Sequence, residues 1–356
     1  MNLLITGATG FIGRHLCAHL TAQHHTVVAL MRRPHELPNL QANVNSLGGR
    51  GTLIKAISGD LAKPKLGITE SLADVDAVIH LGARFAWQLE YKSAYTTNVE
   101  GSLAIAELAK DLGCRLVFIS GFMLENLQHL NQLGIDPAQP DRTNWRKVYR
   151  HAGAYEASKL EAALKVRSFA ANTALDMVEV QPATVAGHSQ TGELDAAQPL
   201  FQLIDNLSRG RLALVPGTSE HWLPLTTVDH LVALITAAAI AKNVPERLLC
   251  LDSDTPTLQQ MLALVGGSIG VKPPRRYVPI PVLRALLSIP GIPKLMNTYP
   301  EALNFIQTKR FDTSITDQFL EHQRLLRPEI GLAIEASARW YLQSALEQRR
   351  VGEVVE

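Results

Sequence analysis

Two side chains four positions apart, Tyr155 and Lys159, have the types and spacing needed to move a proton together. On a helix, positions i and i+4 lie on one face, so the phenol and the ammonium would point the same way. A free phenol has a pKa near ~10, and a nearby ammonium favours the phenolate, which would bring that pKa closer to neutrality. The pair therefore suggests general acid–base chemistry, provided that the surrounding elements place it beside a reactive ligand.

Three glycines near the start of the chain have the spacing of a dinucleotide-binding turn. They follow an apolar run, Leu3–Thr6, and precede a helical pattern, Ile12–Ala22. The first glycine permits a tight turn, the second lets the backbone approach a pyrophosphate, and the third lets the helix pack closely on the strand. The free N–H groups at the start of the helix would then face the phosphates. The predicted ligand-binding residues of this turn are Gly7, Thr9, Gly10, Phe11, Ile12 and Gly13.

The end of the second apolar run, Val27–Met31, indicates which dinucleotide is bound. An NAD site normally has an acidic side chain here, which accepts hydrogen bonds from the ribose hydroxyls. This chain has Arg32 and Arg33 instead. Because guanidinium groups match the geometry of a phosphate, we expect NADP(H), with NAD(H) as the alternative if both arginines are only solvated.

Short β-rich runs and longer helical segments alternate through the first half of the chain, which predicts an α/β fold with a parallel sheet buried on both faces. After about residue 183 the sequence becomes richer in Pro and Gly. We therefore expect a Rossmann-type doubly wound sheet over 1–183, with later strands around 212–252 returning to it. A smaller, mainly helical substrate lobe is expected over 184–356, interleaved with the sheet. The predicted elements of the first half are strands 3–6, 27–31, 53–58, 77–81, 116–120 and 176–181 and helices 12–22, 99–112 and 154–171.

Further motifs follow the glycine-rich turn in a fixed order. They are Asp60-Leu61, His80-Leu81-Gly82-Ala83, Asn98-Val99-Glu100-Gly101-Ser102, Gln181-Pro182-Ala183-Thr184-Val185-Ala186-Gly187 and Val228-Asp229-His230. Over residues 1–240 the chain thereby resembles the extended short-chain dehydrogenases/reductases, which include sugar-nucleotide epimerases, dihydroflavonol-type reductases and thioester reductases. The resemblance implies that Lys159 binds the nicotinamide ribose beside Tyr155, and that further cofactor contacts come from Asp60, Leu61, Leu81, Gly82, Ala83, Asn98, Pro182 and Val185.

The family's third catalytic member, a Ser or Thr, is where this chain departs from the pattern. Alignment of the fifth strand places Ser120 at the first position of the family's serine pair and Gly121 at the second, which is the usual catalytic one. Either Ser120 contacts the substrate from a shifted backbone, or another hydroxyl or a water substitutes, or the site is catalytically weak. A strand-end serine bonded to nearby backbone is the structural alternative.

The substrate is indicated less sharply than the cofactor. Segments after residue 187 are more similar to thioester and fatty-acyl reductases than to epimerases, and the C-terminal part is rich in Leu, Ile and Pro. Arg275-Arg276 is its only compact basic cluster that could hold a sugar-nucleotide diphosphate. We expect an NADPH-dependent reductase of a hydrophobic carbonyl or acyl-thioester substrate. The alternatives are an NAD-dependent sugar-nucleotide epimerase or dehydratase, and a catalytically weakened NADP(H)-binding sensor.

Composition excludes several other classes of function. The 356 residues carry 34 basic and 33 acidic side chains, so the chain has no cationic excess for nucleic acid. Three widely spaced cysteines indicate neither a disulfide framework nor a metal site, and favour a reducing, cytoplasmic setting. No apolar run approaches the ~20 residues of a transmembrane segment. The partners expected are a small-molecule substrate and, from the resemblance, a second copy in a homodimer.

Overall fold

The computed structural model describes residues 1–72, 74–86 and 88–355, with side chains as far as residue 346. The chain divides into two compact units, each assembled from three stretches of sequence. The first unit comprises Met1–Pro182, Leu231–Cys250 and Ser314–Leu325, and the second comprises Ala183–His230, Leu251–Thr313 and Leu326–Glu356.

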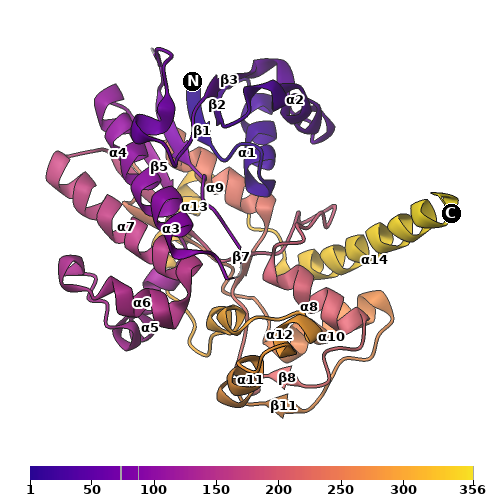
Figure 1. Ribbon diagram of the computed structural model, residues 1–356. Coiled ribbons are helices and arrows are strands. Elements are labelled where there is room, and N and C mark those ends of the chain that lie inside the picture. Colours follow the sequence, from indigo (N-terminus) through magenta and orange to yellow (C-terminus); the bar gives the residue numbers. More distant parts are fainter. Residues whose placement is uncertain (73, 87, 356) are drawn as a thin grey trace. The chain divides into compact units, whose positions relative to one another are not determined.

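A parallel sheet forms the centre of the first unit (Figure 1), as the sequence predicts. Among the described residues it has seven strands, in the order β3 (Ile54–Ser58), β2 (Thr26–Met31), β1 (Asn2–Thr6), β4 (Ala77–His80), β5 (Arg115–Ile119), β6 (Met177–Pro182) and β10 (Arg247–Cys250). Strand β1 pairs with β2 on one side and with β4 on the other, so the strand order reverses there. Ligands of such sheets bind at this reversal, beyond the carboxyl ends of the strands.

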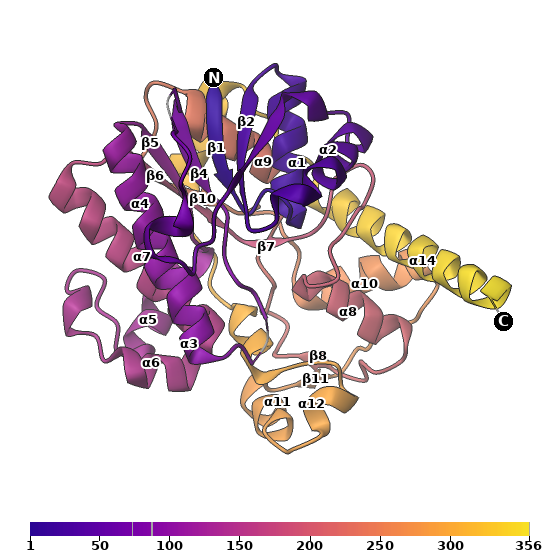
Figure 2. The same cartoon turned by 45° about the horizontal axis from the view of Figure 1, so that its top comes forward.

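Helices cover the sheet because its strands are apolar on both sides: Leu3, Leu4 and Ile5 of β1 are completely buried. Helices α4 and α7 lie side by side on one face, and α1 packs with α2 (Figure 2). The helices of this unit are α1 (Phe11–Ala22), α2 (Leu37–Ser46), α3 (Tyr91–Ala94), α4 (Gly101–Leu112), α5 (Leu127–Leu133), α6 (Trp145–Ala152), α7 (Ala154–Thr173), α13 (Ser314–Gln323) and most of α9 (Val228–Ile240).

One predicted helix is longer than its sequence pattern indicates. The expected segment Val99–Leu112 extends back to Tyr91, through α3 and a π-helical stretch, Tyr95–Glu100. A π-helical turn widens the helix locally and often marks a functional site. Here it contains Asn98, one of the predicted cofactor residues.

The second unit is mainly helical. Its helices are α8 (Pro199–Ser208), α10 (Leu258–Ile269), α11 (Ile280–Leu287), α12 (Ile292–Leu295) and α14 (Ile330–Val355). Two short parallel strand pairs accompany them, β7 (Thr184–Val185) with β9 (Leu225–Thr226) and β8 (Val215–Pro216) with β11 (Tyr277–Val278). Of the strands between 212 and 252, therefore, β10 joins the large sheet, whereas β8 and β9 pair within the second unit.

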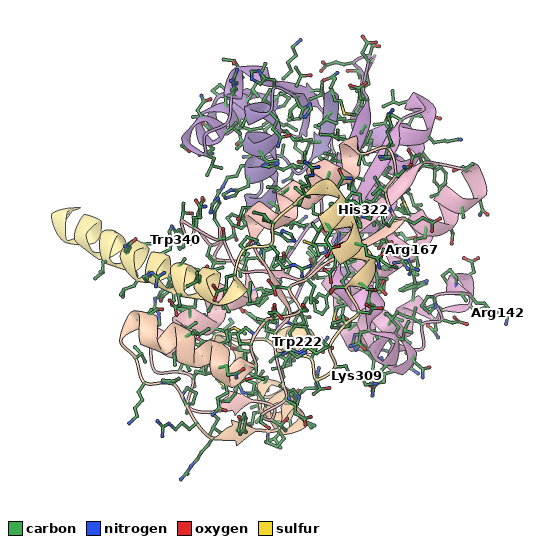
Figure 3. All side chains as sticks on the ribbon, turned by 180° about the vertical axis from the view of Figure 1, so that it is seen from behind. Arg142, Arg167, Trp222, Lys309, His322 and Trp340 are labelled. Atoms are coloured by element: carbon green, nitrogen blue, oxygen red, sulfur yellow. The ribbon has the colours of Figure 1, made fainter. Side chains whose placement is uncertain are left out.

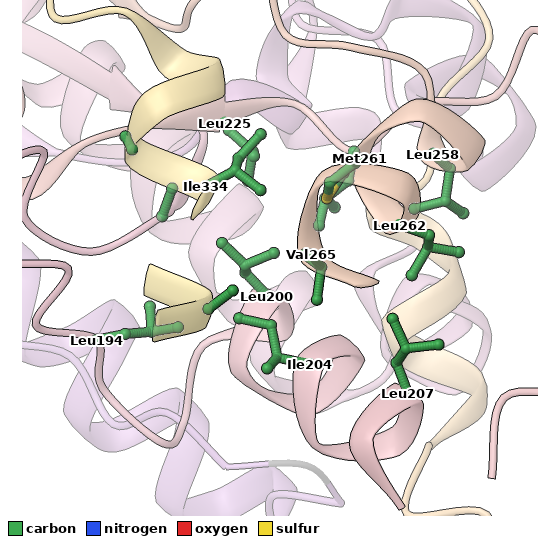
Figure 4. Close-up of a cluster of buried hydrophobic side chains, with 14 of the residues drawn as sticks. Leu194, Leu200, Ile204, Leu207, Leu225, Leu258, Met261, Leu262, Val265 and Ile334 are labelled. Carbon is green, nitrogen blue, oxygen red and sulfur yellow. The ribbon is translucent and has the colours of Figure 1, made fainter. Parts of the chain in front are cut away.

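Apolar side chains from α8, α10 and α14 form the core of the second unit (Figure 4). Ile204, Met261, Val265 and Ile334 are among its buried members. Trp222 is also completely buried, and its indole Nε1 donates to the Lys309 carbonyl over 3.2 Å; both residues are labelled in Figure 3. Across the described residues of the two units, we find no helix with the length and apolarity needed to span a bilayer.

Candidate dinucleotide and reaction site

The glycine-rich turn joins the carboxyl end of β1 to the start of α1. Gly7 has a φ of +74°, and a Cβ on it would lie 2.9 Å from the Gly82 nitrogen after β4. A Cβ on Gly13 would lie 2.1 Å from the Gly7 carbonyl oxygen, so only glycine permits this approach of helix to turn. Gly10, in contrast, is exposed, and its Cβ would meet only the Gly7 carbonyl at 3.4 Å.

Helix α1 begins without a capping side chain. Gly10 is its N-cap and supplies no side-chain acceptor, so the N–H groups of the first turn stay directed out of the helix. Thr9 and Gly10 are exposed, whereas Phe11 is buried and Ile12 half-buried. The turn therefore offers backbone donors and a bare Gly10 surface on one side, which fits a dinucleotide pyrophosphate.

His80 ties the ends of β1 and β4 to the π-helical segment. The Gly82 N–H donates to Thr6 Oγ1 over 2.9 Å, and Thr6 Oγ1 lies 2.7 Å from His80 Nδ1. On the other side of the ring, His80 Nε2 lies 2.9 Å from Ser102 Oγ, which itself donates to the Asn98 carbonyl over 2.6 Å. Because Ser102 donates its hydroxyl proton to Asn98, Nε2 must carry the ring proton, and Nδ1 of the neutral ring can then accept the Thr6 hydroxyl.

This chain of bonds requires a neutral imidazole. Burial, assisted by the charge of Lys159, lowers the pKa of His80 to about 3. His80 is consequently a fixed structural connector between strand ends, with no proton to exchange near neutrality.

Asn98 continues the connection to the helix that carries the reacting groups. Its side-chain nitrogen donates to Ser158 Oγ over 2.9 Å, and Ser158 Oγ donates to the Tyr155 carbonyl over 2.9 Å. Its side-chain oxygen accepts the Arg84 backbone N–H over 2.7 Å. Asn98, predicted as a cofactor contact, is thus engaged in holding α7 and the segment after β4.

Tyr155 and Lys159 lie one turn apart on α7. The Tyr155 ring meets Phe85 edge to face, with centroids 4.5 Å apart. Burial, followed by the carboxylate of Glu156, raises the pKa of Tyr155 to about 12. The sequence-based expectation of a lowered tyrosine pKa is therefore wrong for this structure, because desolvation of the phenolate prevails over attraction to an ammonium.

Lys159 reaches from α7 to the end of β5. Its Nζ donates to the Ile119 carbonyl over 2.7 Å and lies 5.8 Å from the centre of the Phe118 ring. Burial lowers the pKa of Lys159 to about 8, and the carboxylate of Glu179 opposes that effect. An ammonium has three N–H donors, so two remain after the bond to Ile119.

The hydroxyl of Ser120 is occupied inside the sheet. Ser120 Oγ donates to the buried carboxylate of Glu179 on β6, and the other oxygen of this carboxylate accepts Arg167 Nε over 2.6 Å. Arg167, on α7, is labelled in Figure 3. Gly121 has extended backbone, and a Cβ there would meet no described atom within 4 Å. The position that usually carries the family's hydroxyl is therefore open space.

The remaining predicted cofactor residues of the first unit lie around the same strand ends. Asp60, after β3, caps a turn by accepting the Ala62 N–H over 3.0 Å. Leu61 packs so closely on the segment after β4 that a Cβ on Gly82 would lie 2.8 Å from its Cδ1. Leu81 is half-buried and Ala83 is exposed, and Pro182 ends β6 beside Cys250.

The two arginines after β2 differ in their availability. Arg33 pairs with Glu36 at 3.0 Å, whereas exposed Arg32 makes no ion pair or hydrogen bond with a described residue. Val185, the last predicted cofactor residue, belongs to the second unit, where it is buried and pairs with Thr226. Asp229 of the same unit accepts both the backbone N–H and the hydroxyl of Ser189.

Sequence reasoning missed several residues that hold this site together. Thr6, Ser102 and Ser158 each make two hydrogen bonds through one hydroxyl, and no spacing pattern in the sequence indicates such bonds. Glu179 left a signal, since it is an acidic residue at the centre of the otherwise apolar run Met177–Val180. A carboxylate within a buried strand needs a cation or hydroxyl partner, and it has both.

Several known proteins are similar to this chain in sequence. A family of NAD-binding proteins described as "Male sterility protein" matches residues 5–235. A PKS-NRPS hybrid synthetase from Chaetomium globosum is 27% identical over 253 residues, which cover 67% of this chain and 5% of the synthetase. A 2-alkyl-3-oxoalkanoate reductase from Stenotrophomonas maltophilia is 29% identical over 232 residues, which cover 65% of this chain and 62% of that protein.

A solved structure shares the fold over nearly the whole chain. It is the terminal R domain from the myxalamid PKS-NRPS biosynthetic pathway, with a TM-score of 0.75 and 19% identity over 97% of this chain and 91% of that domain. In contrast to this domain, the synthetase is matched over only a small part of its length, and the 2-alkyl-3-oxoalkanoate reductase over less than two thirds.

Proposed function

Because this chain belongs to the NAD-binding family described as male sterility protein, we propose that it reduces a hydrophobic carbonyl or acyl-thioester substrate with NADPH. The family lies within the extended short-chain dehydrogenases/reductases, so the resemblance carried by the sequence motifs is confirmed, and the chain is an NAD(P)-dependent oxidoreductase of that type. The choice of NADPH, the residue roles and the substrate class are the proposal.

The observation that carries the proposal is that several groups able to bind a dinucleotide lie beyond the carboxyl ends of neighbouring strands in the first unit. The uncapped start of α1, the open surface of Gly10 and the free donors of Lys159 all belong to the segments at the reversal of strand order or next to it. When bound there, the dinucleotide supplies a hydride to the substrate's carbonyl carbon. The chain's own residues must then position both ligands and provide the proton.

Tyr155 is the proton donor in this scheme. With a pKa of about 12, the phenol keeps its proton throughout the neutral range. A carbonyl oxygen that gains charge becomes a stronger base than phenolate, so it takes the proton from Tyr155 O–H. In a ketone or aldehyde this step completes the alcohol, and in an acyl thioester the carbon–sulfur bond then breaks to give an aldehyde and a thiol.

Lys159 has two tasks at this point. Its bond to Ile119 fixes the ammonium at the end of β5, and its remaining N–H groups can hold ribose hydroxyls of the dinucleotide. Its positive charge stabilises the phenolate that Tyr155 becomes after donating its proton. Ser120 bonds to Glu179 in the absence of substrate, so we assign it a positioning role.

The cofactor preference rests on Arg32. An exposed guanidinium without a partner among the described residues can form a bidentate contact with a 2′-phosphate, whereas Arg33 is already paired with Glu36. We expect Arg32→Ala to raise the KM for NADPH on the order of 10- to 100-fold, the value of one charged hydrogen-bonded contact. Arg33→Ala is the matched control and should change this KM much less, and neither variant should alter the KM for NADH.

The deciding experiment follows NADPH oxidation with a panel of hydrophobic aldehydes, ketones, 3-oxoacyl compounds, acyl thioesters and nucleotide sugars. We expect turnover of an apolar carbonyl or thioester, and a loss of about 10²–10⁴-fold in kcat for Tyr155→Phe with unchanged NADPH affinity. Turnover of nucleotide sugars alone would refute the proposed substrate class. Equal turnover by Tyr155→Phe would refute the role of the phenol.

A further inference from the structure

One helix of the second unit has apolar side chains on two adjacent faces, one buried and the other exposed. Leu283 and Leu287 of α11 are buried in a small core with Val278 and Leu303. Val282 and Leu286, which share the other face of the helix, are 49% and 44% exposed. A helix at the surface of a water-soluble unit normally carries polar groups on its outer face.

The segment after α11 extends this apolar outer face. Ile289 continues the last turn of α11 through its N–H bond to the Leu286 carbonyl and is 50% exposed. Leu295, at the end of α12, is 72% exposed, and α11 and α12 pack against each other. We call these four side chains, Val282, Leu286, Ile289 and Leu295, the apolar tip. Exposed apolar side chains grouped on two helices that pack together are typical of a site of association.

The charges of residues 255–305, which include the apolar tip, are mostly positive. Glu301 is the one acidic residue of this stretch, and it lies on the 3-10 helix Pro300–Phe305, which packs against α11. Between Thr255 and Pro300 the sequence contains no acidic residue and five cationic ones, Lys272, Arg275, Arg276, Arg284 and Lys294. Four of them are exposed, and Arg284, which is half-buried, donates to the Asn304 side chain. Arg275 and Arg276 directly precede β11, which leads into α11, and Lys294 lies beside Leu295. The chain as a whole is nearly neutral, so this concentration of cations is local.

From this combination we propose that the apolar tip binds the surface of an anionic lipid bilayer. The four side chains would enter the boundary between headgroups and acyl chains, while the cations contact the anionic headgroups. The proposal goes beyond the reductase activity and does not depend on it. It requires only that the chain lie on the surface of a membrane.

Charge decides against a second copy of the chain as the occupant. A symmetric dimer contact would bring the same surface of two copies together, and therefore ten cations against only two Glu301 carboxylates from residues 255–305. An acidic protein could satisfy the cations. However, the acid-free apolar tip offers no polar groups of its own to a protein's backbone, whereas a bilayer requires none.

Vesicle cosedimentation with the full chain tests the proposal. One set of vesicles contains phosphatidylcholine alone. The other contains phosphatidylcholine with about 30% phosphatidylserine, which gives it the negative surface charge of a cytoplasmic leaflet. We expect binding to the anionic vesicles, weakened by salt, and little binding to the neutral ones. Since each surface cation contributes about fivefold in affinity, Arg275→Gln with Arg276→Gln should weaken binding on the order of 25-fold.

Two further substitutions separate the apolar tip from general surface apolarity. Leu286→Asp should abolish sedimentation with vesicles. Leu127→Asp makes the same change at a leucine that is 67% exposed on α5 of the first unit, and it should leave binding intact. NADPH affinity and thermal unfolding should be the same in both variants as in the parent chain, which shows that neither substitution acts by unfolding.

Several results would overturn the proposal. The chain could stay in the supernatant with anionic vesicles, or sediment equally with neutral ones. Analytical ultracentrifugation could show a dimer that Leu286→Asp dissociates, or an acidic carrier protein could bind where vesicles do not. Failure of the reductase assay, in contrast, would leave the vesicle result unaffected, so the two proposals can fail separately.

Discussion

At the scale of single residues, burial sets the protonation of the reacting groups more strongly than pairing does. Tyr155 has a raised pKa and Lys159 a lowered one, which is the direction that desolvation gives to each group. Glu179 opposes this effect at Lys159 from within β6, where Ser120 and Arg167 hold its two oxygens. A carboxylate that does not contact the substrate is therefore part of the electrostatic design of the site.

This arrangement predicts the alkaline limit of activity. The pKa of Lys159 is about 8, so at lower pH the side chain is an ammonium. At higher pH it loses the charge that stabilises the Tyr155 phenolate. We therefore expect kcat/KM to fall as the pH rises through about 8. Glu179→Gln removes a carboxylate that raises the pKa of Lys159, so the fall should move to lower pH.

The pH profile of kcat/KM for both enzymes is the measurement. Glu161→Gln is a suitable control, since Glu161 lies on the same helix but pairs with Lys165 at 2.8 Å. Its profile should coincide with that of the parent enzyme. An unchanged alkaline limb in Glu179→Gln would mean that Glu179 does not influence Lys159.

Gly121 allows the departure from the family pattern to be tested directly. Its backbone is extended and its surroundings are open, so Gly121→Ser should fold and can gain up to about 1 kcal/mol from the lower entropy of the unfolded chain. The added hydroxyl would occupy the family's usual position and should raise kcat/KM about 2- to 10-fold, the value of one hydrogen bond. Gly121→Ala should have the same stability without the gain in rate, and equal rates for both variants would exclude a role for the hydroxyl.

At the scale of elements, Gly10 and Gly13 of the glycine-rich turn differ in the space around them. A Cβ on Gly13 would lie 2.1 Å from the Gly7 carbonyl oxygen, so the helix must move away from the strand. A Cβ on Gly10 finds 3.4 Å to the same oxygen and points from an exposed position. Gly13 is required by the packing of α1, and Gly10, we propose, by the ligand.

The contrast gives a paired prediction for these glycines. Gly13→Ala should lower the free energy of unfolding by about 1–3 kcal/mol, the usual cost of overpacking, and should also weaken NADPH binding. Gly10→Ala should unfold at nearly the parent temperature but bind NADPH at least an order of magnitude more weakly, because its methyl group occupies the approach of the pyrophosphate. Thermal unfolding with and without NADPH measures both effects. Normal NADPH binding by Gly10→Ala would place the diphosphate elsewhere.

At the scale of the whole molecule, the sequence predicted the features that depend on a regular alternation of strands and helices. The alternation of strands and helices predicted the parallel sheet. The order of the motifs predicted the family. The sequence did not reveal the Thr6–His80–Ser102–Asn98 connection, because these bonds join segments distant in sequence through single hydroxyls. Alignment with the family suggested that Ser120 could contact the substrate. In the structure its hydroxyl instead donates to the buried carboxylate of Glu179. Local periodicity reports burial, but it does not report which polar groups find each other.

The sequence predicted that strands around 212–252 return to the sheet, but not which of them does so or that α13 joins the same unit. Strand β10 pairs with β6, and Thr316 Oγ1 of α13 accepts the Leu249 N–H of β10 over 2.8 Å. The first unit therefore depends on residues far beyond Pro182, although Tyr155, Lys159 and the glycine-rich turn all precede it. Without β10 the backbone groups of β6 would be exposed as a sheet edge.

This interleaving makes a final prediction about shortened chains. A chain ending at Pro182 keeps almost every proposed cofactor residue, yet it should aggregate and fail to bind NADPH, because β6 becomes an edge strand without β10 beside the Glu179 network. A chain ending at Leu325 keeps all three stretches of the first unit and loses α14 from the core of the second. It should bind NADPH with an affinity close to that of the full chain, although its second unit unfolds more readily. Size-exclusion chromatography and calorimetric titration distinguish these outcomes, and a monomeric, NADPH-binding chain of residues 1–182 would show that β10 and α13 are dispensable for the site.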